Sequence, residues 1–262
     1  MTYTDLFVDF DDTLYDTHGN AVIALSEVYD HFHLDQHFSG VTLDDVEGAD
    51  AFYRDYWETN VQLWDKYAHG LIERDYLIVE RFRHPLALGH GLEAVTQPFN
   101  EELGDFPEAT RKFCLEVSDY FLGRCATKPG VVDGAHVLME YLRSRGYRLH
   151  MTSNGFHEVQ YSKLRASGLF EYFDTIVLSE DAGVNKPHPD FFRYAFEQTK
   201  APRETTLMIG DNIVTDILGA KMAGLVTLYF NRKGTPRPDT VEGHPDPVDY
   251  EVSSLRAIMD IL

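Results

Sequence analysis

Cysteine is scarce in this sequence, which has only Cys114 and Cys125 among its 262 residues. Two cysteines do not form a disulfide framework, and both lie in or beside a helical pattern, so we expect structural thiols in a reducing compartment. No apolar run reaches the length of a membrane helix. The N-terminus lacks a basic segment followed by an apolar one, so we expect no signal peptide and a cytoplasmic location.

Basic residues are outnumbered by acidic residues, 23 to 43, which gives a formal net charge of -20. A surface of this charge repels nucleic acid polymers and anionic membranes, so neither is an expected partner. It still admits a small anionic ligand if a cation reverses the local field. The 12 histidines are scattered and show no close-spaced pattern such as HExxH, so a zinc site is not expected.

Strand-like segments are missing between residues 17 and 125, where apolar residues recur at helical spacing. Tyr3–Phe10, in contrast, is a β-branched and aromatic stretch that predicts a buried strand, and from Pro129 onward apolar strands alternate with helical segments. Such alternation predicts a parallel sheet with helices on both faces. We therefore predict an α/β fold with a Rossmann-like core, residues 1–16 and 126–262, and an inserted all-helical domain, residues 17–125.

Several individual segments can be predicted from periodicity and from turn residues. The expected helices include Leu43–His69, Ile72–Phe82, Glu93–Glu102, Ile213–Ala223 and Ser254–Leu262, and the Pro- and Gly-rich stretch 234–247 is expected to be a surface loop.

Polar side chains follow each of four predicted strands at the carboxyl end, where ligands bind in open α/β sheets. They are Asp9, Asp11, Asp12 and Thr13 after the first strand, then Ser153-Asn154-Gly155, Asn185-Lys186, and finally Gly210-Asp211-Asn212 with Asp216. Each group alone is equally well explained as a turn, a helix N-cap or a solvated surface. The four groups together, in order and at strand ends, are hard to explain by chance.

Carboxylates of this kind predict a magnesium site. Asp9 and Asp11 are two residues apart and can face the same site from an extended segment, while Asp211 and Asp216 come from another strand end. Four aspartates and Lys186 sum to a charge of -3, which Mg²⁺ would reduce to about -1 so that a phosphate dianion can approach.

These motifs resemble those of the haloacid dehalogenase superfamily, in its phosphatase branch. Four motifs match in order: Asp9-Phe10-Asp11-Asp12-Thr13, Ser153 after an apolar strand, Lys186-Pro187, and Gly210-Asp211 with Asp216. The resemblance implies a Rossmann-like core of the family's type with the helical insertion as its cap. It also covers part of the cap, where several residues resemble those of bacterial pyrimidine 5'-nucleotidases: Asn60, Leu63-Trp64, Tyr67, Gly70, Ile72 and Arg81-Phe82.

The resemblance implies a role for each site residue. Asp9 would be the nucleophile that forms an aspartyl-phosphate, and Asp11 the general acid and then the base. Ser153 and Lys186 would bind the transferring phosphoryl group. Asp9, Asp211, Asp216 and the backbone carbonyl of Asp11 would hold Mg²⁺. The implied substrate-binding set is Asp12, Thr13, Asn154 and Gly155.

The resemblance predicts a Mg²⁺-dependent phosphatase for a small phosphate monoester, with a nucleoside 5'-monophosphate as the first expectation. Phosphoglycolate and sugar phosphates are alternatives, as is a mutase of the β-phosphoglucomutase type. Dehalogenation is disfavoured because Asp11 is the acid/base aspartate two residues after the nucleophile, and dehalogenases lack an aspartate at this position. A regulatory protein on an inactive fold is disfavoured because the motif set is complete. The expected assembly is a monomer or homodimer.

Overall fold

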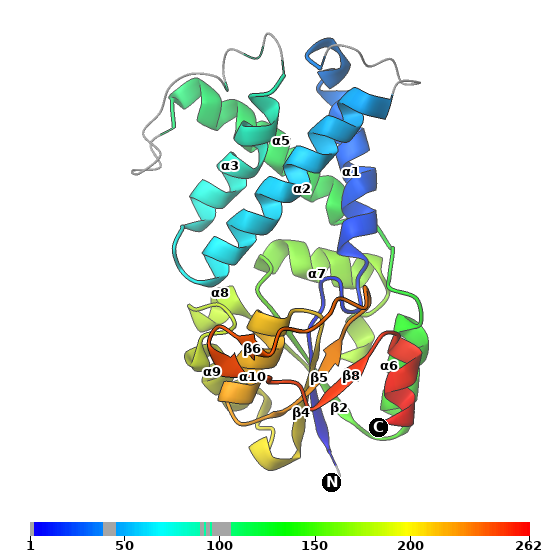
Figure 1. Ribbon diagram of the computed structural model, residues 1–262. Helices are drawn as coiled ribbons and strands as arrows, with labels where there is room; N and C mark the ends of the chain where they lie inside the picture. Colours follow the sequence, from blue (N-terminus) through cyan, green and yellow to red (C-terminus); the bar gives the residue numbers. More distant parts are fainter. Residues whose placement is uncertain (1–2, 39–45, 90–91, 93–94, 96–105) are drawn as a thin grey trace. The chain divides into compact units, whose positions relative to one another are not determined.

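The computed structural model describes residues 3–262 except 39–45, 90–91, 93–94 and 96–105 (Figure 1). The chain forms two compact units. The first consists of Met1–His18 and Thr127–Leu262, and the second of Gly19–Ala126. None of the described helices is both long and apolar enough to cross a membrane.

A six-stranded parallel sheet forms the centre of the first unit. Its strands lie in the order β3-β2-β1-β4-β5-β8, with β1 at Asp5–Val8, β2 at Arg148–Ser153, β3 at Thr175–Leu178, β4 at Thr206–Gly210, β5 at Val226–Phe230 and β8 at Tyr250–Val252. All four residues of β1 are buried, as expected for a central strand covered on both faces. The predicted α/β class with a parallel sheet is confirmed.

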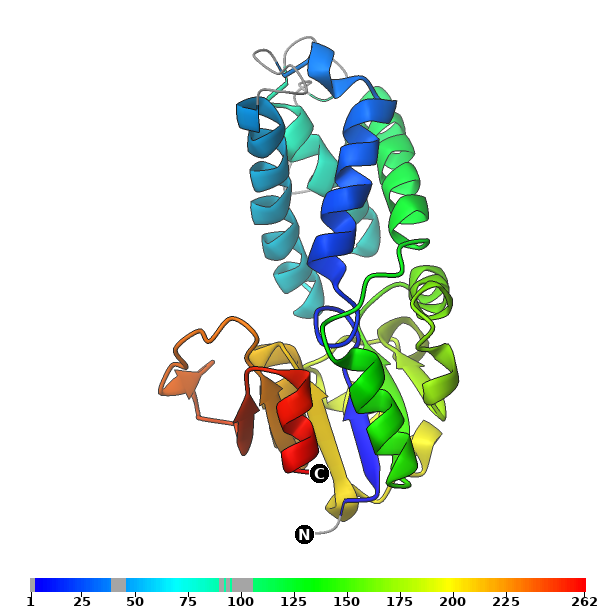
Figure 2. The same ribbon diagram turned by 90° about the vertical axis from the view of Figure 1, so that its right-hand side faces the viewer.

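Alternate residues of β1 face two different apolar layers, because successive side chains of a strand point to opposite faces. Leu6 and Val8 join a layer that includes helix α6 (Ala135–Ser144), helix α7 (His157–Ala166) and a C-terminal 3₁₀ helix (Leu255–Asp260). Phe7 joins the layer formed by α9 (Pro189–Thr199) and α10 (Gly219–Met222). Figure 2 shows α6 beside the C-terminal 3₁₀ helix, where the Tyr141 hydroxyl donates to the Met259 carbonyl.

Two predictions near the C-terminus need correction. The segment expected to be an α-helix at Ser254–Leu262 is a 3₁₀ helix at Leu255–Asp260, a form common in short terminal pieces. The expected loop 234–247 contains a small hairpin of β6 (Thr240–Val241) and β7 (His244–Pro245). Its two central residues, Glu242 and Gly243, have φ of 48° and 78°, the left-handed pair that a tight hairpin turn requires.

The second unit is helical. Its helices are α1 (Thr17–His31, whose first two residues belong to the first unit), α2 (Val46–Ala68), α3 (Arg74–Leu86) and α5 (Glu108–Cys125). Tyr56, Phe82 and Phe121 pack with ring centroids 5.1–5.4 Å apart, so part of the unit's aromatic content forms its own core. Cys114 and Cys125 are buried and are not joined in a disulfide. The predicted helix Glu93–Glu102 lies almost entirely outside the described residues.

Candidate active site

The carboxyl ends of β1, β2 and β4 meet at one edge of the sheet. Val8 pairs in register with Met151 of β2 and Ile209 of β4, and the Asp9 N–H donates to the Ile209 carbonyl at 2.9 Å. Because the strands are parallel and in register, the residues that follow them emerge on the same side. The acidic groups predicted from the strand ends therefore come together here.

Three carboxylates and one lysine form a cluster at this edge, in which all but the half-buried Asp211 are buried. One oxygen from each of Asp9, Asp211 and Asp216 lies within 4.8 Å of the others. The Lys186 Nζ donates to Asp9 Oδ1 at 2.8 Å, to Asp216 Oδ1 at 2.6 Å and to the Thr152 carbonyl at 2.8 Å. Lys186 is only 1% exposed, and these bonds use all three of its protons. Lys186 must therefore break one of these three hydrogen bonds before it can donate to a further anion.

Thr13 joins two members of this cluster. Its hydroxyl donates to Asp9 Oδ2 at 2.9 Å, with a longer contact of 3.3 Å to Asp211 Oδ1, and accepts the Asp211 N–H at 3.1 Å. The sequence predicted Thr13 among the substrate-binding residues. In the structure its side chain is fully buried and fixes Asp9 relative to Asp211.

The cluster has an excess of negative charge. Burial raises the pKa of Asp9 to about 7, with a further contribution from Asp216 and an opposing one from Lys186. Burial, followed by repulsion from Asp9 and Asp216, raises the pKa of Asp211 as well. Burial alone would lower the pKa of Lys186, but Asp216 and Asp9 outweigh it and raise that pKa. One lysine thus offsets only part of the charge of three carboxylates.

Asp216 reaches the cluster from an unusual helix. The sequence predicted one α-helix at Ile213–Ala223, but Ile213–Leu218 forms a π-helix that continues as α10. The Ile217 N–H donates five residues back to the Asn212 carbonyl, and the Asn212 N–H donates to Asp216 Oδ2 at 3.1 Å. This wider turn brings Asp216 back toward the strand end, and π-turns are often found at functional sites.

Gly210 at the end of β4 leaves the space that Asp216 occupies. A Cβ at position 210 would overlap the Asp216 carboxyl group. We expect Gly210→Ala to displace Asp216, to lower the free energy of unfolding by about 1–3 kcal/mol, as in other overpacked cores, and to reduce activity. Urea unfolding measures the first effect. Gly123→Ala is the control: a Cβ there meets nothing within 4 Å and α5 gains an alanine, so stability should not fall.

The Asp11 side chain makes its hydrogen bonds to residues that do not belong to the carboxylate cluster. Its Oδ1 accepts the Lys163 Nζ at 2.6 Å and the Thr17 hydroxyl at 2.7 Å, and its Oδ2 accepts the Gln160 Nε2 at 2.5 Å. Burial opposes ionisation, but the Lys163 ion pair, with help from Thr17 and Gln160, outweighs it and lowers the pKa of Asp11. Two aspartates only two residues apart therefore have their pKa values moved in opposite directions.

The remaining predicted residues occupy distinct positions. The Asn154 side chain exchanges two hydrogen bonds with the Lys186 backbone, at 2.9 and 2.8 Å, and so holds the lysine loop. The Asp12 N–H donates to the Tyr15 carbonyl, and its carboxylate accepts the His18 N–H. Asp12 has a φ of 57°, which a turn aspartate tolerates. The Asp12 N–H is therefore engaged within its own turn, and the substrate-binding role of Asp12 stays a prediction.

Lys163 and Gln160 of α7 were missed by the sequence reasoning. Their signal was present, because the buried face of α7 contains Val159, Gln160, Lys163 and Leu164. Polar residues at i and i+3 within an otherwise apolar stripe, on the helix that follows Ser153, are candidates for a site at the strand ends. Lys163 also changes the charge estimate: four aspartates and two lysines sum to -2.

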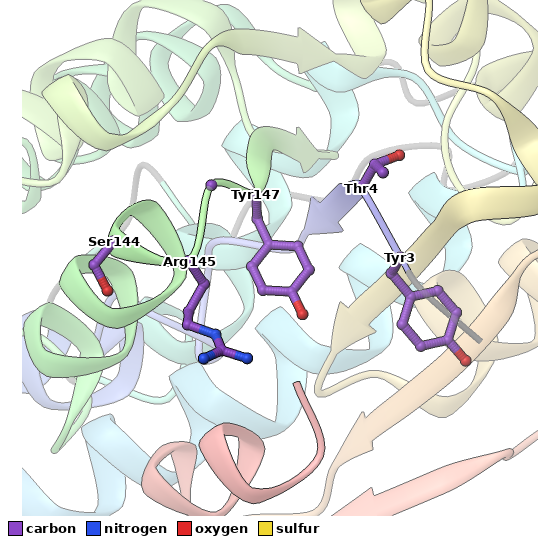
Figure 3. Close-up of a pocket in the computed structure, with 6 residues that line it drawn as sticks. Tyr3, Thr4, Ser144, Arg145 and Tyr147 are labelled. Atoms are coloured by element: carbon purple, nitrogen blue, oxygen red, sulfur yellow. The ribbon is translucent and has the colours of Figure 1, made fainter.

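A hollow of about 470 Å³ lies elsewhere in the first unit (Figure 3). It is lined by Tyr3, Thr4, Ser144, Arg145, Gly146 and Tyr147, which precede β1 and β2 and so mark the amino ends of these strands. The Tyr147 hydroxyl already donates to the Leu262 carbonyl at 2.8 Å. With no carboxylate in its lining, this hollow lacks the cation ligands and the nucleophile that the strand-end cluster provides.

The chain is similar to known hydrolases along most of its length. The family model for haloacid dehalogenase-like hydrolases matches residues 6–224. The pyrimidine 5'-nucleotidase YjjG of Escherichia coli is 32% identical over 212 residues, which cover 80% of this chain and 82% of YjjG. The pyrimidine 5'-nucleotidase PynA of Streptococcus pneumoniae is 29% identical over 266 residues, which cover 100% of this chain and 96% of PynA.

A solved structure shows the same fold. The crystal structure of the HAD-hydrolase YfnB from Bacillus subtilis, bound to magnesium, matches with a TM-score of 0.76 and 27% identity. The match covers 100% of this chain and 99% of YfnB.

Proposed function

Because the chain belongs to the haloacid dehalogenase-like hydrolase family, we propose that it is a Mg²⁺-dependent phosphomonoesterase that works through an aspartyl-phosphate on Asp9. One observation carries this proposal: two aspartates two residues apart have different environments. Asp9 lies in a carboxylate cluster with Lys186, and Asp11 has its own cation, Lys163. Such a division suits a nucleophile and a separate acid/base group.

The two chemical steps balance with these residues alone. In the first, an Asp9 oxygen attacks phosphorus, the bond to the ester oxygen breaks, and Asp11 gives a proton to the leaving alkoxide. In the second, a water attacks the phosphorus of the aspartyl-phosphate, Asp11 takes the proton of that water, and the bond to Asp9 breaks. The pKa of Asp11 is lowered in this structure, which suits the base step. A bound phosphate dianion would raise it and favour the acid step.

The donor set fits Mg²⁺. Asp9, Asp211 and Asp216 offer carboxylate oxygens within 4.8 Å of one another, the hard oxygen ligands that this cation prefers. Burial, and then repulsion among the carboxylates, raises the pKa values of Asp9 and Asp211, and a bound cation would relieve this repulsion. The carbonyl of Asp11 remains a proposed ligand, whereas its side chain is engaged by Lys163 and Gln160. When bound, the cation would neutralise the site and polarise the phosphoryl oxygens.

Metal-free stability should depend on pH through this cluster. The pKa of Asp9 is raised to about 7, and that of Asp211 is raised too, whereas unfolded aspartates ionise near about 4. Between about pH 4 and pH 7 the folded cluster binds protons that the unfolded chain has already released. The free energy of unfolding is therefore greatest near pH 4 and falls as the pH rises toward 7. For each such proton, the free energy of unfolding falls by up to about 1.4 kcal/mol per pH unit.

Urea unfolding in EDTA at pH 5, 6 and 7 measures this dependence. Asp211→Asn should show a flatter profile than wild type, because one titrating carboxyl is gone. Mg²⁺ should stabilise the wild type more at pH 7.5 than at pH 5.5, since protons compete with the cation for the same oxygens. Equal profiles for the two proteins in EDTA would contradict the assignment.

Nucleoside 5'-monophosphates are the substrates we propose first, because YjjG and PynA, two relatives covered over most of their length, are pyrimidine 5'-nucleotidases. A panel of phosphate monoesters, with Mg²⁺ and a measurement of released phosphate, tests this choice. The panel contains pyrimidine and purine monophosphates, phosphoglycolate and sugar phosphates. The highest kcat/KM should be on a pyrimidine monophosphate. Isomerisation of a sugar phosphate without phosphate release would instead indicate a mutase.

A further inference from the structure

Helix α7 places two polar side chains against the proposed acid/base group, and one of them also contacts the proposed phosphate ligand. We propose that Gln160 and Lys163 are positioning residues that hold the Asp11 carboxyl and the Ser153 hydroxyl as one unit. This inference rests on the proposed phosphomonoesterase function and concerns residues outside the four sequence motifs.

Lys163 fixes one side of the Asp11 carboxyl group. Its Nζ lies 2.6 Å from Asp11 Oδ1, and its side chain is 11% exposed against 29% for Asp11. The ammonium also lies 5.1 Å from the centre of the Tyr15 ring, a cation–π contact. A lysine this well buried is costly unless its charge is paired, and Asp11 supplies the ion pair. The pair is therefore a defined contact rather than a mobile surface one.

Gln160 fixes the other side. It is fully buried, and its Nε2 donates to Asp11 Oδ2 at 2.5 Å and to Ser153 Oγ at 2.6 Å. A carboxylate only accepts, so the amide nitrogen must face Asp11, and both of its protons are used. Its Oε1 is buried without a partner among the described residues. An unpaired acceptor costs free energy, and such groups often mark a functional constraint.

The same contact orients Ser153. Its Oγ accepts from Gln160 Nε2 and from the Gly155 N–H at 3.0 Å. With both lone pairs occupied, the hydroxyl proton is the only hydrogen-bonding capacity that Ser153 has left. The serine is thus set to donate, which is what a ligand of a phosphoryl oxygen must do.

Gly155 makes room for this arrangement. A Cβ at position 155 would overlap the Gln160 amide group. The turn after β2 therefore accommodates the Gln160 side chain only with glycine at this position. The sequence Ser153-Asn154-Gly155 and the buried face of α7 act together to connect Ser153 with Asp11.

Two methionine substitutions test the proposal, because methionine is unbranched and similar in length to both side chains but makes none of these hydrogen bonds. Lys163→Met should lower kcat/KM on an alkyl phosphate by about 10- to 100-fold, the size found for other outer-shell partners. It should lower kcat/KM on p-nitrophenyl phosphate much less, because kcat/KM reports the first step and that leaving group departs without a proton. Gln160→Met should lower kcat/KM on both esters, since the phosphoryl group that Ser153 binds is common to them.

The controls separate positioning from folding. Lys163→Arg keeps the charge and should restore most of the alkyl phosphate activity. Arg165→Met removes a positive charge from an exposed position of the same helix. The activity on both esters should be unchanged. The proposal would be overturned if Lys163→Met lowered kcat/KM equally on the two esters, or if Gln160→Met kept full activity.

A structural measurement distinguishes failure of this inference from failure of the proposed function. Crystal structures of Lys163→Met and Gln160→Met should show changed side-chain positions for Asp11 and Ser153. Unmoved side chains would overturn the positioning roles whatever the activity. A wild type that hydrolyses no phosphate ester in the panel would instead refute the phosphomonoesterase assignment, and the crystal structures would still decide whether α7 holds these two groups.

Discussion

Asp9→Asn is expected to reduce kcat on every phosphate ester by more than about 10³-fold, since loss of a covalent nucleophile in a hydrolase can cost up to about 10⁶ in kcat. The amide oxygen of asparagine is a poor nucleophile and a weaker cation ligand, so both proposed roles of Asp9 are lost together. Phosphate release from the preferred ester, in saturating Mg²⁺, measures the effect.

Folding should survive this change. Burial and repulsion from Asp216 raise the pKa of Asp9, so the neutral amide relieves an unfavourable charge, and its oxygen can still accept from Lys186. Asp16→Asn is the matched control, because Asp16 is paired with Arg232 at 3.1 Å outside the cluster and its loss should leave kcat nearly unchanged. Substantial turnover by folded Asp9→Asn would refute the aspartyl-phosphate route. Borohydride reduction of the acyl phosphate in wild type, with mass spectrometry, locates the modified residue directly.

The fold class follows from the sequence because its signals are periodic and local. The apolar run at Leu6-Phe7-Val8 predicts a strand buried on both faces, and the structure shows β1 at the centre of the sheet. Helix details are less predictable. The π-helix at Ile213–Leu218 depends on the contact of Asp216 with Lys186, 30 residues away, and on the bond from the Asn212 N–H. No window of local sequence contains the partner that stabilises it.

The sequence predicted the acidic residues of the site and Lys186, but it did not predict which carboxylate each lysine contacts. Strand ends of a parallel sheet place Asp9 and Asp211 at one edge, a consequence of topology alone. Which lysine pairs with which aspartate depends on side-chain reach and on burial. Lys186 was expected to bind phosphate, yet it donates to Asp9 and Asp216. Lys163 lies in no motif, and although its place on the buried face of α7 makes it a candidate, its contact with Asp11 identifies its partner.

The charged residues of the site form two groups, one neutral and one with a net negative charge. Asp11 and Lys163 neutralise each other, so the acid/base group needs no further cation. Asp9, Asp211 and Asp216 retain a net charge of -2 after Lys186 is counted. The proposed divalent cation would match this charge at oxygen ligands and would allow the proposed phosphate dianion to approach.

Lys186→Met is the second large expected effect. Methionine is unbranched and close to lysine in length, but it leaves Asp9 and Asp216 buried without their ion-pair partner. Removing one member of a buried pair costs about 3–5 kcal/mol, so the free energy of unfolding in EDTA should fall by about that amount. Activity should be lost as well, because no other described lysine contacts Asp9. Urea unfolding and phosphate release measure the two effects.

A double substitution separates the two causes. Lys186→Met with Asp216→Asn removes one negative charge together with the positive one, so it should recover much of the lost stability without recovering activity. Mg²⁺ should also stabilise Lys186→Met more than wild type, because three uncompensated carboxylates bind a cation more tightly than three that share a lysine. If the double variant were no more stable than Lys186→Met, side-chain packing rather than charge would account for the role of Lys186. Recovery of stability in the double variant is therefore the result that assigns the stabilising role of Lys186 to its charge.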